Sequence, residues 1–104
     1  MYVTSYSGII FVEGKHPEAT PIKPIEVSIK GIEHSQLKSL DDVKARMVTI
    51  ARSTGANAIV EFKYGQKSPS FLGSLFNLDD VGWYGSGIAA KLPEFTYKQI
   101  IEST

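Results

Sequence analysis

The sequence contains no cysteine, so disulfide bonds, thiolate metal ligands and a cysteine nucleophile are excluded. It has only two histidines, His16 and His34, and their spacing gives neither an HxxxH nor an HExxH pattern. A metal site would require both histidines to converge in space with Asp79 or Asp80. Because nothing in the spacing favours that convergence, we predict no metal ligands and no cofactor.

The chain also lacks an excess of charge, since lysine plus arginine and aspartate plus glutamate number 11 each. A zero net charge gives no electrostatic attraction to nucleic acid or to an anionic membrane surface. No apolar run approaches the roughly 18 residues that span a bilayer, and no basic segment precedes Lys15, as a signal peptide would require. We therefore expect no nucleic-acid partner, no membrane span and a cytoplasmic location.

Catalytic motifs are missing as well. No serine lies in a G-x-S-x-G elbow, and the sequence GWYGSG is neither a Walker A loop nor a GxGxxG turn that opens a helix. The acidic pairs Asp41-Asp42 and Asp79-Asp80 are adjacent in sequence, so they suit capping and a turn better than acid–base catalysis. We predict no catalytic residues, and a non-enzyme is the more consistent interpretation.

The 104 residues that are present allow one domain, which we expect to span 1–104. The stretch from Ser39 to Tyr64 organises the chain, because it predicts a helix, a glycine stop and a strand. Ser39 can cap the helix, Ser35 offers an earlier start, and Gly55 can end it in a left-handed conformation. Apolar residues then share one helical face at spacings of three and four. They are Leu40, Val43, Met47 and Ile50.

After Gly55 the period of the apolar residues changes from 3.6 to 2. This alternation predicts a half-buried strand with one apolar side, which we expect to pack under the helix. On that side lie Ala58, Val60, Phe62 and Tyr64, and on the opposite side lie Ile59, Glu61 and Lys63.

The remaining elements follow from composition. Tyr2–Glu13 is rich in strand formers, with a bulge or bend expected at Gly8 between two short strand pieces. Gly14–Pro24 holds three prolines and predicts a loop. Ile25–Lys30 and Val81–Leu92 predict strands, whereas the periodicity of the tail after Pro93 does not decide between strand and helix. The fold class is therefore α+β, a two-layer sandwich with a mainly antiparallel sheet and one main helix, in the order β-β-α-β-β.

The long connection at Gly65–Asp80 is unusually apolar, with a possible helical face that starts after Ser70. Large apolar side chains in a loop need to be covered, and each contributes roughly 1.5–3 kcal/mol when buried. Three alternatives stay open: packing on the chain's own core, contact with another subunit, and contact with a lipid surface. We predict subunit contact through this loop and the tryptophan that follows it. The predicted interaction residues are Phe71, Leu72, Leu75, Phe76, Leu78 and Trp83.

The segment ARSTGANAIVEFKY, followed later by YGSGIAA, resembles the YbjQ-like family of small bacterial proteins. Members have a helix that ends in a pattern like A-x-x-x-G-A-[ND]-A-[IV]-V, then a strand, and a last strand with a G-T-A-like end. The matching residues are Ala51, Gly55, Ala56, Asn57, Ala58, Ile59, Val60, Gly87, Ile88 and Ala89. Two segments depart from the family, because Gly31–Leu40 is shorter than usual and Gly65–Asp80 is longer and more apolar.

The resemblance implies a dodecin-subunit-like fold and a ring-shaped homo-oligomer such as a pentamer. It also carries a heavy-metal-binding label, which has no counterpart in a chain without cysteine or clustered histidines. Our first hypothesis is a non-enzymatic, self-associating protein. The alternative is a metal- or small-ligand-binding module, whose ligand the sequence does not identify.

Overall fold

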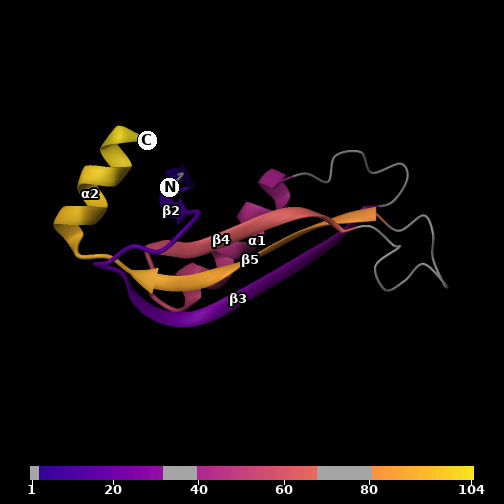
Figure 1. The fold of residues 1–104 in the computed structure, drawn as a ribbon, viewed down its shortest axis with the longest axis horizontal. Coiled ribbons are helices and arrows are strands. Elements are labelled where there is room, and N and C mark those ends of the chain that lie inside the picture. Colours follow the sequence, from indigo (N-terminus) through magenta and orange to yellow (C-terminus); the bar gives the residue numbers. More distant parts are fainter. Residues whose placement is uncertain (1–2, 32–39, 68–80) are drawn as a thin grey trace.

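The computed structural model describes residues 3–31, 40–67 and 81–104, which form a five-stranded sheet and two helices (Figure 1). The strand order is β1-β2-β4-β5-β3. Only β2 and β4 pair in parallel, and the other neighbours pair antiparallel, so the predicted α+β class and mainly antiparallel sheet are confirmed. The elements are β1 (Val3–Tyr6), β2 (Ile9–Val12), β3 (Thr20–Gly31), α1 (Leu40–Ser53), β4 (Ala58–Lys67), β5 (Val81–Lys91) and α2 (Glu94–Ser103).

The expected order β-β-α-β-β is incomplete at both ends of the chain. The first extended stretch is a hairpin of two short strands, and the predicted bend at Gly8 is part of its turn. Its two-residue turn is Ser7-Gly8, where φ is 54° and 87°. Two consecutive positive φ values give the turn a twist that matches antiparallel strands. At the other end, the undecided tail forms the helix α2.

Strand β3 corrects a second expectation, because it begins inside the predicted loop of Gly14–Pro24. Pro21 and Pro24 both lie in this strand and pair with residues of β5. Proline lacks an N–H, but β3 is an edge strand with a neighbour on one side only. An edge strand has no ladder bonds on its free side, which is where sheets accommodate proline.

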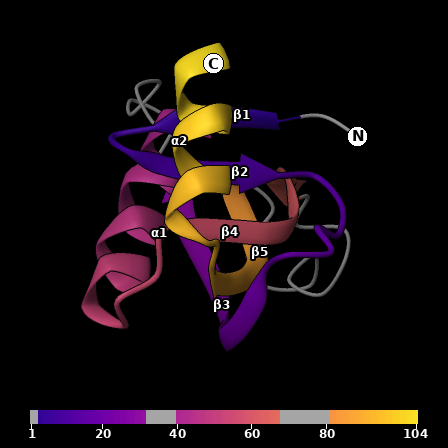
Figure 2. The ribbon, with the colours of Figure 1, turned by 90° about the vertical axis from the view of Figure 1, so that its left-hand side faces the viewer.

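Helix α1 is described over Leu40–Ser53 and covers one face of the sheet (Figure 2), whereas Ser35 and Ser39, the two predicted starts, lie outside the described residues. Gly55 ends it with φ at 85°, as the sequence indicates. The helix lies very close to β5 at Gly85. A Cβ at Gly85 would lie 2.9 Å from the Met47 Sδ and closer still to Val43 Cγ1. The absence of a side chain there lets the helix pack directly on the strand backbone.

The core lies on both faces of the sheet, and the predicted alternation in β4 is wrong. Ile59 and Phe62 belong to the cluster under α1, whereas Ala58 and Val60 belong to a second cluster on the other face. The alternation changes because a β-bulge shifts the register between Val60 and Lys63. One inserted residue turns the following side chains to the opposite face.

Helix α2 packs at one end of the second face, so a purely two-layer arrangement is not what forms (Figure 1, Figure 2). Beside it, the Asn57 side chain joins the end of β5. Its amide donates to the Leu92 carbonyl at 3.1 Å, and its carbonyl accepts from the Leu92 N–H at 2.8 Å. The asparagine of the G-A-N-A turn therefore fixes where β4 and β5 begin and end. No helix in the described part of the chain is long and apolar enough to cross a membrane.

Candidate functional site

A groove of about 790 Å³ lies at the outer edge of β4, which the neighbouring strand leaves uncovered. Strand β2 pairs with β4 only at Ala58 and Ile59. One further bond follows, from the Glu61 N–H to the Gly14 carbonyl at 2.7 Å. Among the described residues, no strand pairs with this side of β4 beyond that point. The groove thus exposes strand backbone as well as side chains.

Glu61 occupies an unusual backbone conformation at the centre of this site. Its φ is 52°, in the left-handed region that favours glycine, and it lies in the bulge of β4. For a residue with a Cβ this conformation costs roughly 1–2 kcal/mol. The bond to Gly14 holds the bulge in place. Strain of this kind persists where the surrounding structure enforces it, and it is common at functional sites.

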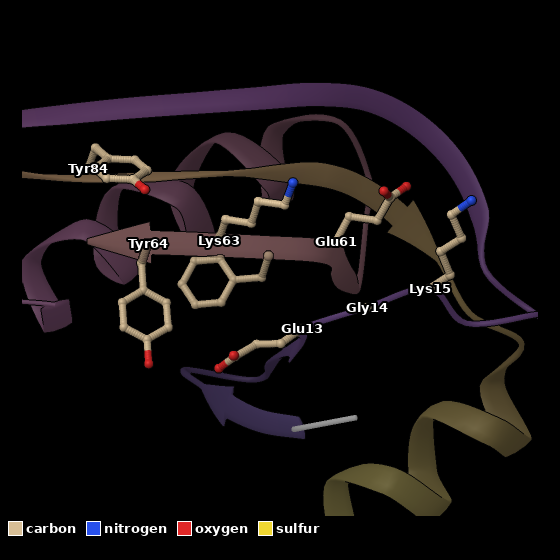
Figure 3. Close-up of a pocket in the computed structure, with 8 residues that line it drawn as sticks. Glu13, Gly14, Lys15, Glu61, Lys63, Tyr64 and Tyr84 are labelled. Atoms are coloured by element: carbon tan, nitrogen blue, oxygen red, sulfur yellow. The ribbon is translucent and has the colours of Figure 1, made fainter. Parts of the chain in front are cut away.

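Charged side chains of both signs surround the groove (Figure 3). Figure 3 shows Lys63 and Glu61 on the same side of β4, with Lys15 beyond Glu61 and Tyr64 on the opposite side. Within the described part of the chain, the Lys15, Glu61 and Lys63 side chains form no ion pair or hydrogen bond. Their charges are therefore available to a bound molecule.

Two tyrosines give the groove aromatic walls. Tyr84 is half-buried on β5, and its ring lies so close to Gly65 that a Cβ there would lie 3.0 Å from the Cε1 atom. The ring is thereby packed flat over the strand. Tyr64 is 41% exposed and stacks on Phe62, with ring centroids 5.2 Å apart. Both rings are positioned by packing and still face solvent.

A second hollow of about 400 Å³ continues from the first across the face that α1 does not cover. Glu61 and Lys63 line both hollows. The second hollow adds apolar surface from Pro24 and Ile88, and one more carboxylate from Glu26. The combined site therefore has charges of both signs next to an apolar floor.

The predicted interaction residues lie mostly outside the described residues, namely Phe71, Leu72, Leu75, Phe76 and Leu78. Trp83 is described. It lies in β5 opposite Ile29 and packs, partly buried, against the cluster under α1. Its role in subunit contact stays a prediction.

The histidine hypothesis is only partly visible in the structure. His16 accepts a hydrogen bond on Nδ1 from the Glu18 N–H at 3.1 Å, so it helps to form the loop before β3. His34, Asp79 and Asp80 lie outside the described residues. No group of three or more histidine, aspartate or glutamate side chains suited to a metal occurs within residues 3–31, 40–67 and 81–104.

Sequence reasoning missed the groove. It treated Glu61 and Lys63 as the solvated side of a regular strand, and it left Lys15 unassigned. The sequence did contain a sign of the groove, because the opposite charges of Glu61 and Lys63 interrupt the otherwise apolar segment AIVEFKY. The bulge itself depends on Gly14, which is distant in sequence. Local pattern could not reveal it.

These features define a small α+β protein with a charged groove at an uncovered strand edge. No family model matches the chain, and no curated protein matches it in sequence. A similar structure is a protein of unknown function of the DUF74 family from Pediococcus pentosaceus ATCC 25745. The TM-score is 0.60 at 14% identity, covering 84% of this chain and all of that chain. At this identity the similarity shows the fold.

Proposed function

We propose that the protein is a non-enzymatic, self-associating protein whose subunits join edge to edge into a ring. The observation that carries this proposal is that the sheet has two long uncovered edges besides the short edge strand β1. β3 is an edge strand of 12 residues, and β4 is uncovered beyond Glu61. Pairing β3 of one subunit with β4 of the next is a head-to-tail contact. Such contacts form closed rings when the rotation between subunits closes.

The side chains of the two edges are compatible with this pairing. Ile25, Val27 and Ile29 of β3 face the α1 side of the sheet, and so does Phe62 of β4. Tyr64 stacks on Phe62 and leaves apolar ring surface exposed at the edge. A neighbouring β3 would cover that ring and extend the apolar layer under the helices. Cross-strand aromatic and β-branched pairs stabilise a sheet by about 0.2–1 kcal/mol each.

The bulge and Lys63 also fit a specific contact. Natural edge strands use bulges and lysines to prevent unspecific pairing. A partner strand must therefore accommodate both features, which favours one defined neighbour over aggregation. The DUF74 family of the structural neighbour is the YbjQ-like family that the G-A-N-A turn resembles. That resemblance supports a ring and gives five subunits as the number to test.

The native mass from light scattering tests this proposal. We expect the parent protein to show five times its chain mass of 11.4 kDa. Tyr64→Lys should reduce the mass towards that of one chain, because a lysine at this edge cannot form the apolar contact. Phe95→Lys is the matched control, since Phe95 is 73% exposed and lies on α2, which takes no part in the proposed strand pairing. A parent mass of one chain at all concentrations would contradict self-association.

The apolar segment gives an independent test of the same proposal. Phe71→Ser/Phe76→Ser should lower the native mass if those side chains contact a neighbouring subunit. An unchanged mass would exclude this segment from the contact, and the strand edges would then form the contact without it. A loss of mass in Phe95→Lys would instead locate the contact on α2 and contradict the edge-to-edge route.

A second candidate function is a small-ligand-binding module. The two connected hollows at Glu61 and Lys63 favour it, because pockets of about 300–1,000 Å³ with a few placed polar groups are typical of ligand sites. The groove offers carboxylate, ammonium and phenol groups. This chemistry suits an organic ligand better than a metal ion.

A further inference from the structure

We infer that the two hollows bind a small zwitterion of the α-amino-acid type with an apolar side chain. This inference rests on the second candidate function, that of a ligand-binding module, and it competes with the edge-to-edge ring, because a β3 strand on the β4 edge would cover the first hollow. Glu61 would accept the ammonium of the ligand, and Lys63 with Lys15 would donate to its carboxylate. The apolar side chain would lie in the second hollow, on Pro24 and Ile88.

The spacing of the charges selects a molecule that carries both signs close together. Glu61 and Lys63 are two residues apart in β4, and each of them lines both hollows. Figure 3 shows both on one side of β4, and neither side chain forms an ion pair within the described residues. A simple anion would meet Glu61, and a simple cation would meet the two lysines. An adjacent ammonium and carboxylate satisfy both partners through charge-assisted hydrogen bonds.

The backbone at Glu61 supports a binding role for its side chain. Glycine would occupy φ of 52° without steric cost. A glutamate at this position loses stability, yet it places a carboxylate where the two hollows meet. The bulge is held by Gly14, so the carboxylate has a fixed origin before any ligand arrives. A fixed binding group lowers the entropic cost of association.

The hollow on the open face supplies the rest of the selectivity. Tyr84 is packed on Gly65 at the end nearer Lys63, and Ile88 with Pro24 forms an apolar floor. Glu26 also lines this hollow. A ligand with a second negative charge in its side chain would meet that carboxylate. Amino acids with apolar side chains are therefore preferred over acidic ones.

Calorimetric and NMR titrations of the whole chain test the inference with L-phenylalanine and L-leucine as probes. We expect saturable binding, with amide shift changes around Glu61, Lys63 and Ser86. N-acetyl-L-phenylalanine lacks the ammonium, and L-phenylalaninamide lacks the carboxylate. Each derivative should bind at least about tenfold more weakly than L-phenylalanine, because one lost charge-assisted bond is worth roughly 1.4 kcal/mol or more.

Matched variants assign the binding to these side chains. Glu61→Gln and Lys63→Met keep the size of each side chain and remove its charge, so each should weaken L-phenylalanine about tenfold. Glu102→Gln on the exposed side of α2 should leave the affinity unchanged. The native mass is measured on the same samples, which separates a failure of binding from a failure of self-association.

Three results would overturn the inference. Equal binding of the derivatives would reject the zwitterion while keeping a ligand-binding module. No saturable binding by either amino acid would reject the zwitterion site and remove the support for the module. Binding that Glu61→Gln and Lys63→Met leave unchanged would place the ligand elsewhere.

Discussion

The two faces of the sheet differ in how tightly they are filled. On the face under α1, Gly85 brings the helix onto the strand backbone, and Met47 and Val43 are fully buried. On the opposite face α2 covers only one end, and hollows follow at Glu61 and Lys63, whose charges no described residue pairs. Close packing leaves no room for a ligand, whereas the open face has both room and polar groups. Both faces contribute buried core, and the proposed ligand site lies where the second face is left open.

Truncating one side chain on each face to alanine should give the largest difference in the free energy of unfolding. Met47→Ala opens a cavity in a fully buried position and should lower the free energy of unfolding by about 2–5 kcal/mol. Ile88→Ala removes a half-buried side chain on the open face and should cost about 1 kcal/mol. Urea denaturation at one fixed protein concentration measures both. Equal losses would contradict the division between the faces.

Alanine substitutions at two neighbouring residues of β5 should give a smaller difference in stability between the faces. Gly85→Ala places a Cβ against Val43 and Met47 and should destabilise by about 1–3 kcal/mol through overpacking. Ser86→Ala, on the open face, should stay within about 0.5 kcal/mol of the parent. The same denaturation series checks the pair. A Gly85→Ala protein as stable as the parent would mean that the helix can move away at no cost.

The junction between the faces depends on Asn57. Asn57→Asp keeps the acceptor for the Leu92 N–H but loses the donor to the Leu92 carbonyl, which should cost about 1 kcal/mol. Asn57→Ala loses both bonds and should cost about 2 kcal/mol. Gln99→Glu is the exposed control on α2 and should have little effect. Similar stability for all three variants would show that the hydrogen bonds from the Asn57 side chain to Leu92 do not stabilise the fold.

The scaffold was more predictable from sequence than the site. Helical spacing and Gly55 identified α1 and its end because both signals are local. The prolines of β3 misled because their tolerance depends on the strand lying at an edge. The bulge at Glu61 depends on the carbonyl of Gly14, far away in sequence. The site thus arises from contacts between distant segments, and periodicity within one segment cannot report them.

The assembly proposal and the ligand proposal use the same edge of β4. A β3 strand added there would cover the first hollow, which Glu61, Lys63 and Tyr64 line. Saturating L-phenylalanine should therefore lower the native mass of the parent protein, which light scattering measures. A native mass that stays unchanged at saturation would show that the assembled protein leaves the groove open.

The unfolding free energy of Glu61→Gly, with and without L-phenylalanine, tests the central claim most directly. Relief of the left-handed backbone should make the variant about 1 kcal/mol more stable than the parent without ligand. Adding L-phenylalanine should stabilise the parent, because a ligand that binds only the folded state raises its stability, and should not stabilise the variant. A variant that is no more stable, or that gains as much from the ligand as the parent, would contradict the account.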